Sequence, residues 1–495
     1  MAGIRLSELL SALSPPYEWA GEGDPWITGI TGDSRRVHPG NLFVAIPGRS
    51  TDGHRFIPDA IANGAVGVVA ERPPRAPLPR NAIYITVRSG RRALAELCSE
   101  FYENPTRKLF TVGITGTKGK TSAAHFSAAV LGETATELIS TVTNALQRDL
   151  EQTTPAPEDL QRWALDAVRQ GKRNLVIEVS AHALHQQRVH AVDFDVAVFT
   201  SFSHDHLDYF RDRDEYLDAK LTLFRRLAPS AAAIVHLEDP AALRVLRATR
   251  AKTITYGRSE KADLWADEIE LSPKGTRCRV HTPRGSFPLT LKVPGPFMLE
   301  NALAAVGVGL VRGLPPERIR ERLEGVESIP GRLEIYAAKG GFTVAIDFAH
   351  SPDSLERVLR FLREFYPRVI VVFGCGGDSD RLKRPRMGAI AARLSDYAIL
   401  TSDNPKGEDP RAIVREIERG LLEAHPQARY EAILERRRAI ERALERARPG
   451  DCVLIAGKGH ERYQIFRDRA VPFNDYEFLV ELGALEAHGA SAPAA

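Results

Sequence analysis

The sequence predicts an α/β protein of three domains: a small N-terminal α/β domain, a central domain built on a parallel sheet, and a C-terminal α/β domain. With 495 residues, the chain is long enough for roughly three domains of about 150 residues each. Short apolar runs typical of buried strands alternate with segments of helical pattern, which favours parallel strands joined by crossover helices. We expect the domains to cover residues 1–88, 89–331 and 332–495.

The N-terminal unit is predicted from three apolar runs of strand type, at residues 42–46 (LFVAI), 65–70 (AVGVVA) and 82–87 (AIYITV). A polar Asp-Ser-Arg triplet at 33–35 precedes them. Taken alone, this triplet is typical of a turn with a solvated charge pair, so it indicates no function by itself.

Residues 108–122 (KLFTVGITGTKGKTS) carry the strongest local signal in the chain. The apolar run at 109–114 predicts a strand, glycines follow it, and a helix is predicted from about residue 120. Backbone N–H groups of such a turn and the N-terminus of the helix form a cradle for phosphate. Lys120 can offer a point charge to the β- and γ-phosphates, and Thr121 a hydroxyl to Mg²⁺. The stretch therefore predicts a nucleotide-phosphate site.

This loop departs from the common phosphate-loop motif at one position. The first glycine of Gly-x-x-x-x-Gly-Lys-[Ser/Thr] should stand at 114, which is Ile114, and Gly113 comes one residue earlier. A glycine-rich turn that only joins a strand to a helix is the alternative. The Gly-Lys-Thr sequence at 119–121 favours the nucleotide site.

Three further strands are predicted downstream, at residues 174–179, 195–200 and 231–236. In a parallel sheet with crossover helices, functional side chains gather at the carboxyl ends of the strands. Glu178 and His206 follow two of these strands, so both could reach a metal ion held near Thr121. A carboxylate at a buried strand end usually has a partner, which favours a functional role.

The last 160 or so residues repeat the α/β pattern, with strands predicted at 344–347, 369–373, 397–401 and 452–456. Polar clusters follow each of the four strands, and they lie at residues 347–350, 374–380, 403–406 and 457–461. Each cluster alone is ordinary for a loop. Four clusters at one edge of one sheet predict a binding face.

The composition of the chain disfavours several classes of protein. A formal net charge of +3 and an aromatic content of 7% disfavour a nucleic-acid-dependent motor, and we expect no nucleic-acid partner. No apolar run is long enough to span a membrane. The four cysteines lack the spacing of a zinc site or a disulfide framework, which fits a reducing compartment. We expect a cytoplasmic monomer.

Seven motifs in one order resemble the Mur ligases, ATP-dependent enzymes that build the peptide of bacterial cell-wall precursors. The phosphate loop is followed by six short motifs, Glu-Val-Ser (178–180), Asp-His-Leu-Asp (205–208), Gly-Arg-Leu-Glu (331–334), Asp-x-Ala-His (347–350), Asp-Asn-Pro (403–405) and Gly-Lys-Gly-His-Glu (457–461). The chain is most similar to the members that add the third residue of the peptide. The resemblance implies a UDP-binding N-terminal domain, a central ATPase domain of phosphate-loop type and a Rossmann-like C-terminal domain.

The implied reaction uses ATP and Mg²⁺ and has UDP-N-acetylmuramoyl-L-alanyl-D-glutamate and a diamino acid as substrates. ATP would phosphorylate the γ-carboxylate of the D-glutamate, and the amino group of the diamino acid would attack the acyl phosphate. Positive charge is the main catalytic need, because two anions must approach each other. A regulator that binds nucleotide without catalysis is disfavoured, because Lys120 and Glu178 are both present.

The resemblance also implies roles for individual residues. The catalytic residues would be Lys120, Lys220 and His206. The ATP site would contain Gly116, Thr117, Lys118, Gly119, Lys120, Thr121, Ser122, Asn301, Arg332, Asp347 and His350. The UDP-muramoyl-dipeptide would contact Ser34, Thr153, Thr154, Ser180 and Arg188. The amino acid would contact Asp403, Asn404, Lys406, Gly457 and Glu461. Magnesium ligands would be Thr121, Glu178, His206 and Lys220, the last as a carbamate, although a helical lysine alone would be expected on the surface.

Two positions leave the amino acid open between meso-diaminopimelate, L-lysine and L-ornithine. Family members that add diaminopimelate have Arg where this chain has Lys406, and a second Arg where it has Ser379. A lysine can pair with a carboxylate but lacks the bidentate fork of arginine. The alternative within the fold is a folylpolyglutamate or cyanophycin synthetase, against which the Asp-Ser-Arg triplet and the Asp-Asn-Pro motif argue.

Overall fold

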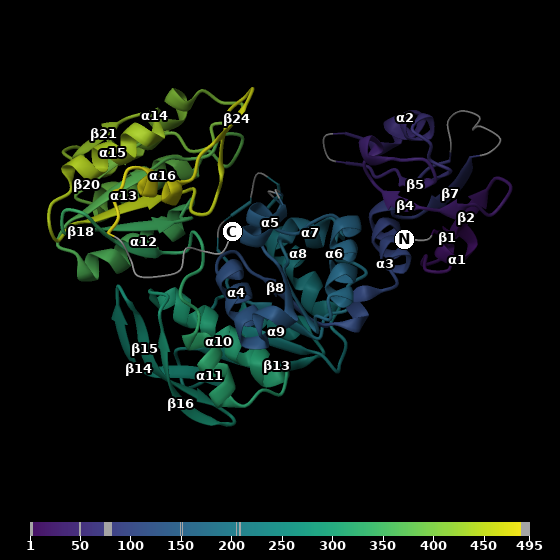
Figure 1. Cartoon of the computed structure of the whole chain (residues 1–495), viewed down its shortest axis with the longest axis horizontal. Helices are drawn as coiled ribbons and strands as arrows, with labels where there is room; N and C mark the ends of the chain where they lie inside the picture. The colour runs from purple at the N-terminus through teal and green to yellow at the C-terminus, as the bar shows by residue number, and fades with distance from the viewer. Residues whose placement is uncertain are drawn as a thin grey trace.

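The computed structural model describes residues 3–48, 51–73, 82–148, 150, 152–203, 205–206 and 209–486. Three large sheets of five, nine and six strands follow one another along the chain (Figure 1). The nine-stranded sheet lies between the other two in the view, with the N-terminal part in purple on one side and the C-terminal part in green and yellow on the other. The predicted α/β class with a central parallel sheet is confirmed.

The N-terminal sheet has the order β2-β7-β6-β5-β4 and is parallel except for β2. Its strands are β2 (Tyr17–Ala20), β4 (Gly29–Thr31), β5 (Asn41–Val44), β6 (Gly67–Ala70) and β7 (Ile83–Val87), with β1 (Ile4–Arg5) and β3 (Trp26–Ile27) paired separately. Its helices are α1 (Leu6–Leu10), α2 (Ile57–Ala62) and α3 (Gly90–Phe101), with short 3-10 turns η1 (Ser34–Arg36) and η2 (Gly53–Phe56). The three predicted strands are confirmed, and α3 packs into the core of this sheet through apolar side chains such as Leu94 and Leu97.

The central sheet has the order β16-β15-β14-β13-β12-β11-β8-β10-β9, parallel from β9 to β14 and antiparallel from β14 to β16. Its strands are β8 (Phe110–Thr115), β9 (Thr136–Ile139), β10 (Asn174–Glu178), β11 (Val196–Phe199), β12 (Ala232–His236), β13 (Lys252–Gly257), β14 (Leu264–Ser272), β15 (Gly275–Thr282) and β16 (Gly285–Leu291). Its helices are α4 (Lys120–Leu131), α5 (Thr141–Arg148), α6 (Pro157–Arg169), α7 (Ala181–His185), α8 (Arg213–Arg225), α9 (Ala242–Ala248), α10 (Pro296–Val311) and α11 (Pro316–Glu324), with η3 (Pro105–Lys108) and η4 (Glu133–Ala135).

Strand β8 lies where the strand order of the central sheet reverses. Its neighbours are β10 on one side and β11 on the other. Ligands of such sheets bind outside the carboxyl ends of the strands, where the strand order reverses. Side chains of α4 and α10 share one hydrophobic core with the sheet, and those of α6 and α8 share the other. The loop between β8 and α4 therefore leaves a sheet that is packed by helices on both of its faces.

The C-terminal sheet has the order β17-β18-β22-β19-β20-β21 and is parallel except for β17. Its strands are β17 (Glu334–Ala338), β18 (Phe342–Asp347), β19 (Val369–Phe373), β20 (Tyr397–Leu400), β21 (Tyr430–Ala432) and β22 (Cys452–Ala456), followed by the hairpin β23 (Tyr463–Ile465) and β24 (Ala470–Pro472). Its helices are α12 (Pro352–Phe365), α13 (Lys383–Leu394), α14 (Pro410–Ala424), α15 (Arg436–Arg446) and α16 (Asp475–Glu481). The four predicted strands are confirmed, and their polar clusters follow them at one edge of the sheet.

Across the described ranges, no helix combines the length and the apolar character that crossing a membrane requires. All four cysteines are unpaired and buried, as the absence of a disulfide spacing predicts.

Candidate active site

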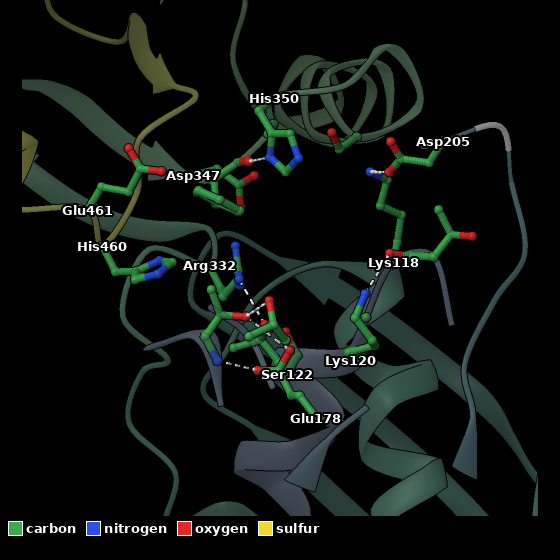
Figure 2. A pocket seen from close by; sticks show the side chains of 18 of the residues that line it. Lys118, Lys120, Ser122, Glu178, Asp205, Arg332, Asp347, His350, His460 and Glu461 are labelled. Carbon is green, nitrogen blue, oxygen red and sulfur yellow. Dashed lines mark hydrogen bonds and ion pairs between the residues drawn. The ribbon is translucent and has the colours of Figure 1, made fainter. Parts of the chain in front are cut away.

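The candidate site is a cavity of about 480 Å³, within the range of small-molecule sites. The phosphate loop and the ends of β10 and β11 line one wall, and the loops after β18, β20 and β22 line the opposite wall (Figure 2). The predicted residues that line it are Thr117, Lys118, Gly119, Lys120, Thr121, Ser122, Thr153, Glu178, His206, Asn301, Arg332, Asp347, His350, Asn404, Lys406 and Glu461. The cavity therefore brings together predicted ATP, metal and amino-acid residues from two sheets.

The phosphate loop needs its glycines for steric reasons. Gly119 has a φ of +85°, and a Cβ there would stand 2.4 Å from the Asn301 side-chain oxygen. Lys120 donates from Nζ to the carbonyls of Gly116 and Thr117, at 3.1 and 3.0 Å. Burial lowers the pKa of Lys120. A phosphate would therefore bring a counter-charge to an ammonium group whose hydrogen-bond partners, within the described part of the chain, are backbone carbonyls.

A second cation reaches the phosphate loop from the C-terminal sheet. Arg332 donates to the hydroxyl of Thr121 at 2.8 Å, and its guanidinium stacks 4.6 Å from the ring centre of Phe348. Asp347, at the end of β18, accepts a hydrogen bond from the Leu333 backbone at 2.8 Å. Burial raises the pKa of Asp347 to about 6, although Arg332 opposes the shift. The start of the C-terminal part is thus attached to α4, the helix that follows the phosphate loop.

Glu178 ends β10 and is 1% exposed. Its carboxylate accepts hydrogen bonds from the backbone and the hydroxyl of Thr141, at 3.0 and 3.2 Å. Its backbone carbonyl accepts from Thr154 at 2.8 Å, and the Thr154 hydroxyl in turn accepts from the Ser180 backbone at 3.0 Å. The end of this strand therefore connects the cavity to predicted contacts of the UDP-linked substrate.

Lys220 lies behind the phosphate loop, on α8. It is 1% exposed, donates to the Gly116 carbonyl at 2.7 Å and lies 4.4 Å from the ring centre of Tyr216. The pKa of Lys220 is held well below its usual range by burial and by the neighbouring Lys120. The surface position expected for a helical lysine is therefore wrong, and a buried neutral amine is what the surroundings favour.

His206 stands in the predicted Asp-His-Leu-Asp motif and lines the cavity with a φ of +55°. Its ring meets that of His182 edge-on, with centres 4.8 Å apart. Burial lowers the pKa of His206. Leu207 and Asp208 of the motif lie outside the described residues. Within the described ranges, no cluster of three or more His, Cys, Asp or Glu side chains could hold a metal ion.

A second cavity, of about 320 Å³, lies between the N-terminal and central sheets. Arg188 lines it and donates to the Thr154 carbonyl and to the Gln152 side chain, at 2.8 and 2.9 Å. On the facing side, Arg36 pairs with Asp159 at 3.0 Å. Ser34 is not one of the residues described as lining this cavity, whereas its neighbour Asp33 is. Leu150 borders both cavities, so the two are adjacent.

Three family models match the chain: "Mur ligase family, catalytic domain" over residues 26–102, "Mur ligase middle domain" over 114–309 and "Mur ligase, glutamate ligase domain" over 331–459. A protein of Syntrophomonas wolfei is 40% identical over 487 residues, which are 97% of this chain and 99% of that protein. The chain belongs to the Mur ligase family. The Syntrophomonas protein is named UDP-N-acetylmuramoyl-L-alanyl-D-glutamate–2,6-diaminopimelate ligase, as is a Geobacillus thermodenitrificans protein that is 42% identical over 95% of this chain and 98% of its own.

Solved structures agree with this Mur ligase in fold. A structure of a UDP-N-acetylmuramoyl-L-alanyl-D-glutamate–2,6-diaminopimelate ligase, 28% identical, covers 92% of this chain and 94% of its own with a TM-score of 0.64. A structure of MurF from Acinetobacter baumannii, 23% identical, covers 92% of this chain and 96% of its own with a TM-score of 0.67. The resemblance that the motifs indicate is confirmed, as is the three-domain architecture of the fold class.

The predicted amino-acid residues of this Mur ligase lie on two loops of the C-terminal sheet. Asn404 donates to the Glu461 carboxylate at 2.7 Å. Lys406 is exposed, has a φ of +50° and donates its backbone N–H to Ile465 at 3.0 Å. Gly457 has a φ of +111°, and a Cβ there would stand 2.4 Å from the Asp403 carboxylate. The two loops are therefore packed against each other at the cavity wall.

Three further side chains of this Mur ligase lie at or beside the cavity, although the sequence analysis gave them no individual role. Asp205 pairs with Lys118 at 3.0 Å across the mouth of the phosphate loop. His460 lines the cavity, is 4% exposed and finds no hydrogen-bond partner for Nδ1 among the described residues. Lys458 is fully buried and contacts both Asn404 and Glu461. Lys458 and His460 stand in the Gly-Lys-Gly-His-Glu motif, which was the available signal.

Proposed function

We propose that this chain uses ATP to join 2,6-diaminopimelate to the D-glutamate of UDP-N-acetylmuramoyl-L-alanyl-D-glutamate in the synthesis of cell-wall precursors. The observation that carries the proposal is the lining of the large cavity, where the phosphate loop faces Asn404, Lys406 and Glu461. A nucleotide and an amine would meet there. The second cavity borders the first at Leu150, so a UDP-linked peptide could extend its carboxylate toward the phosphate.

The chemistry follows from the charges of the cavity. Transfer of the γ-phosphoryl group to the substrate γ-carboxylate brings two anions together, and Lys120 and Arg332 supply positive charge where they meet. The amine of the amino acid then attacks the acyl phosphate, forms the amide and releases phosphate. Walls from two sheets would hold the amine in line, which converts a bimolecular step into an intramolecular one.

Support for magnesium comes from the chemistry of the donors. Mg²⁺ prefers oxygen ligands and is usually bound by one or two protein oxygens together with substrate phosphates. The hydroxyl of Thr121 and the carboxylate of Glu178 both line the cavity beside the phosphate loop, so the residues fit this ion. When bound, it would neutralise charge on the β- and γ-phosphates. His206 also lines the cavity and would lie close to the ion.

We also propose that Lys220 is carbamylated. Carbon dioxide forms a bond to the nitrogen of a neutral amine, which releases one proton to water, and the buried Lys220 side chain has no carboxylate partner at hydrogen-bond distance among the described residues. The carbamate would be an anion among the cations Lys118 and Lys120, which influence Lys220 electrostatically. Its oxygens could serve a second magnesium ion.

The choice of diaminopimelate rests on Lys406 and on the names of the relatives. Lys406 borders the cavity and keeps the positive charge of the family's arginine, which could pair with a distal carboxylate, whereas Ser379 does not keep that charge. A side-chain ammonium, as in L-lysine or L-ornithine, would be repelled there. No observation favours a folylpolyglutamate or cyanophycin synthetase: a Mycobacterium tuberculosis folylpolyglutamate synthase structure, 20% identical, covers 73% of this chain and shares only the fold.

Each of the three domains, built around one of the three large sheets, would have its own role. The part up to about residue 88 would bind the UDP moiety, the part to about 331 would bind and hydrolyse ATP, and the Rossmann-like remainder would bind the amino acid. Ser34, Thr153, Thr154, Ser180 and Arg188 would contact the UDP-linked substrate. We expect the protein to act as a monomer in the cytoplasm, where ATP and UDP-linked precursors are available.

The experiment that tests the function is phosphate release from ATP in the presence of UDP-N-acetylmuramoyl-L-alanyl-D-glutamate. Meso-diaminopimelate, L-lysine and L-ornithine are compared side by side, and the products are identified by mass spectrometry. We expect full turnover only with all three substrates and a preference for diaminopimelate. Turnover with none of the amino acids would contradict the proposal, and a preference for lysine or ornithine would contradict the choice of amino acid.

A further inference from the structure

Lys458 is a lysine with no exposed surface at the base of the amino-acid wall. Its ammonium group donates to the Asn404 side-chain oxygen at 3.1 Å, to the Glu461 carboxylate at 2.8 Å and to the Tyr463 carbonyl at 2.6 Å. An ammonium group has three N–H donors, so all of them are used inside the protein. Lys458 therefore cannot itself bind a substrate carboxylate without losing one of these bonds.

The three side chains form a closed triangle that joins two loops. Asn404 donates to the same Glu461 oxygen, Oε2, that Lys458 contacts, at 2.7 Å. The Asn404 oxygen also accepts a hydrogen bond from the Ile465 backbone at 3.1 Å. Residue 404 follows β20 and residue 461 follows β22, so the triangle fixes the distance between the two strand ends at the cavity.

The triangle leaves one acceptor of Glu461 for another group. The hydrogen bonds from Asn404 and Lys458 both end at Oε2 of the carboxylate, and among the described residues no donor reaches Oε1. The Glu461 side chain is 31% exposed and lines the cavity. The remaining oxygen can therefore accept a hydrogen bond from a ligand in the cavity.

We propose that Lys458 is a positioning residue that keeps Glu461 ionised and turned so that its second oxygen receives the ammonium group of the incoming amino acid. This inference rests on the proposed function for the identity of the ligand. It does not make Lys458 a catalytic residue, because Lys458 touches only protein atoms.

The electrostatics around Glu461 support this role. Burial raises the pKa of Glu461, and Asp403 raises it further, whereas Lys458 and Asn404 lower it. Arg332 and Arg436 also interact electrostatically with Glu461. A half-buried carboxylate without Lys458 would keep its proton to a higher pH, and a neutral carboxyl group binds an ammonium group poorly.

The test compares Lys458→Met with the wild type, and Lys339→Met serves as the control because Lys339 is exposed in the turn between β17 and β18. We expect Lys458→Met to raise the KM for the amino acid at least tenfold, to change the KM for ATP less than twofold and to move the acid limb of kcat/KM for the amino acid to higher pH. A purely structural defect would lower kcat and raise both KM values together. Added n-propylamine should partly restore Lys458→Ala, because it replaces the missing ammonium group.

A second measurement needs no turnover. With ¹³C-labelled glutamate, NMR titration follows the Glu461 carboxyl, which the Glu461→Gln variant assigns, and we expect Lys458→Met to raise its midpoint. An unchanged midpoint would overturn the inference even if activity fell. If the wild type used no diamino acid but the midpoint rose, the proposed function would fail and the positioning of Glu461 would stand. Lys458→Gln, which keeps hydrogen bonding without the charge, carries the same expectations if Lys458→Met does not fold.

Discussion

Arg332 and Thr121 lie 211 residues apart in the sequence, and a hydrogen bond of 2.8 Å joins the guanidinium to the hydroxyl. This bond attaches the start of the C-terminal part to the first turn of the helix that receives phosphate. The same hydroxyl is a predicted ligand of magnesium, and a hydroxyl oxygen has two lone pairs, so it could accept from Arg332 and still bind an ion. The Arg332 guanidinium lies beside the phosphate loop and lines the cavity, where it could pair with bound phosphates.

The first prediction concerns ATP binding. Hydrogen bonds to charged groups contribute about 1.5–3 kcal/mol, so Arg332→Met should weaken ATP binding by roughly one to two orders of magnitude. Calorimetric titration with a non-hydrolysable ATP analogue measures the effect. Arg438→Met is the matched control, because Arg438 is exposed and pairs only with glutamates of its own helix. Equal affinity of wild type and Arg332→Met would show that the guanidinium does not face the nucleotide.

The second prediction concerns Lys220. Because the side chain is buried and the proposed carbamate supplies charge, Lys220→Ala should lose about 10²–10³ in kcat, as removal of one preorganised electrostatic group does. Bicarbonate should raise wild-type activity, and a short carboxylic acid should partly restore the variant. A carbamate signal in ¹³C NMR with labelled bicarbonate should be present in the wild type and absent in Lys220→Ala. Full activity of Lys220→Ala would contradict the proposed carbamate.

The third prediction concerns the amino acid. Removal of the Lys406 ammonium should lower kcat/KM for meso-diaminopimelate about tenfold or more, because a charged partner of the distal carboxylate is lost. Lys406→Arg should retain diaminopimelate use, since the charge remains. Competition between diaminopimelate and L-lysine, read by mass spectrometry, gives the ratio directly. If Lys406→Ala lost activity equally with both amino acids, Lys406 would not contact the distal end.

The fourth prediction is a pH dependence of stability. Asp347 has a usual pKa of 3.8, which burial raises to about 6 in the folded chain. Below about pH 4 both states hold the proton, and between pH 4 and 6 only the folded state does. The free energy of unfolding should therefore fall by up to about 3 kcal/mol as pH rises through this window.

Urea unfolding of ligand-free protein at pH 4, 5 and 6 measures the Asp347 contribution as the difference between wild type and Asp347→Asn. The variant cannot ionise at this position, so its stability should fall less steeply with pH. Asp468→Asn, at an exposed carboxylate, should keep the wild-type slope. Parallel pH profiles for wild type and Asp347→Asn would contradict the prediction.

The fifth prediction concerns the second cavity. Arg188 borders it and is held by Thr154 and Gln152, so Arg188→Met should raise the KM for UDP-N-acetylmuramoyl-L-alanyl-D-glutamate at least tenfold. The KM for ATP should stay within about twofold, because the nucleotide lies in the other cavity. Steady-state kinetics with each substrate varied in turn separates the two effects. A rise in the KM for ATP alone would place the UDP-linked substrate elsewhere.

Local signals predicted the parts of the fold that depend on short stretches of chain. The strand before the phosphate loop, observed as β8, is a run of buried apolar residues, and such a run is visible without its neighbours. Strand β2 was not predicted, because residues such as Glu18 and Trp19 are exposed and show no alternation. It is a strand because it pairs with β7, where Tyr17 lies opposite Val87.

The candidate site shows the same difference between features visible in one stretch of sequence and features that depend on distant partners. The phosphate loop and the strand-end clusters could be predicted, since each is contiguous in sequence. The burial of Lys220 could not, because it depends on α8 packing behind a loop 104 residues earlier in the chain, where the carbonyl of Gly116 meets the ammonium group. The role of Lys458 also needs a partner, Asn404, that lies 54 residues away. Contacts of this kind are set by topology, which a pattern in one segment does not contain.

The four buried cysteines have a practical consequence for following motion in this enzyme. Thiol reagents attack exposed thiolates, and burial raises the pKa of Cys98, Cys278, Cys375 and Cys452. The native chain should therefore be nearly inert to maleimide dyes. A pair of cysteines introduced on the surface, one on α9 and one on α14, would then carry the only fluorophores. Energy transfer between them would report how far the central and C-terminal sheets approach each other during a single turnover, without any native thiol being replaced.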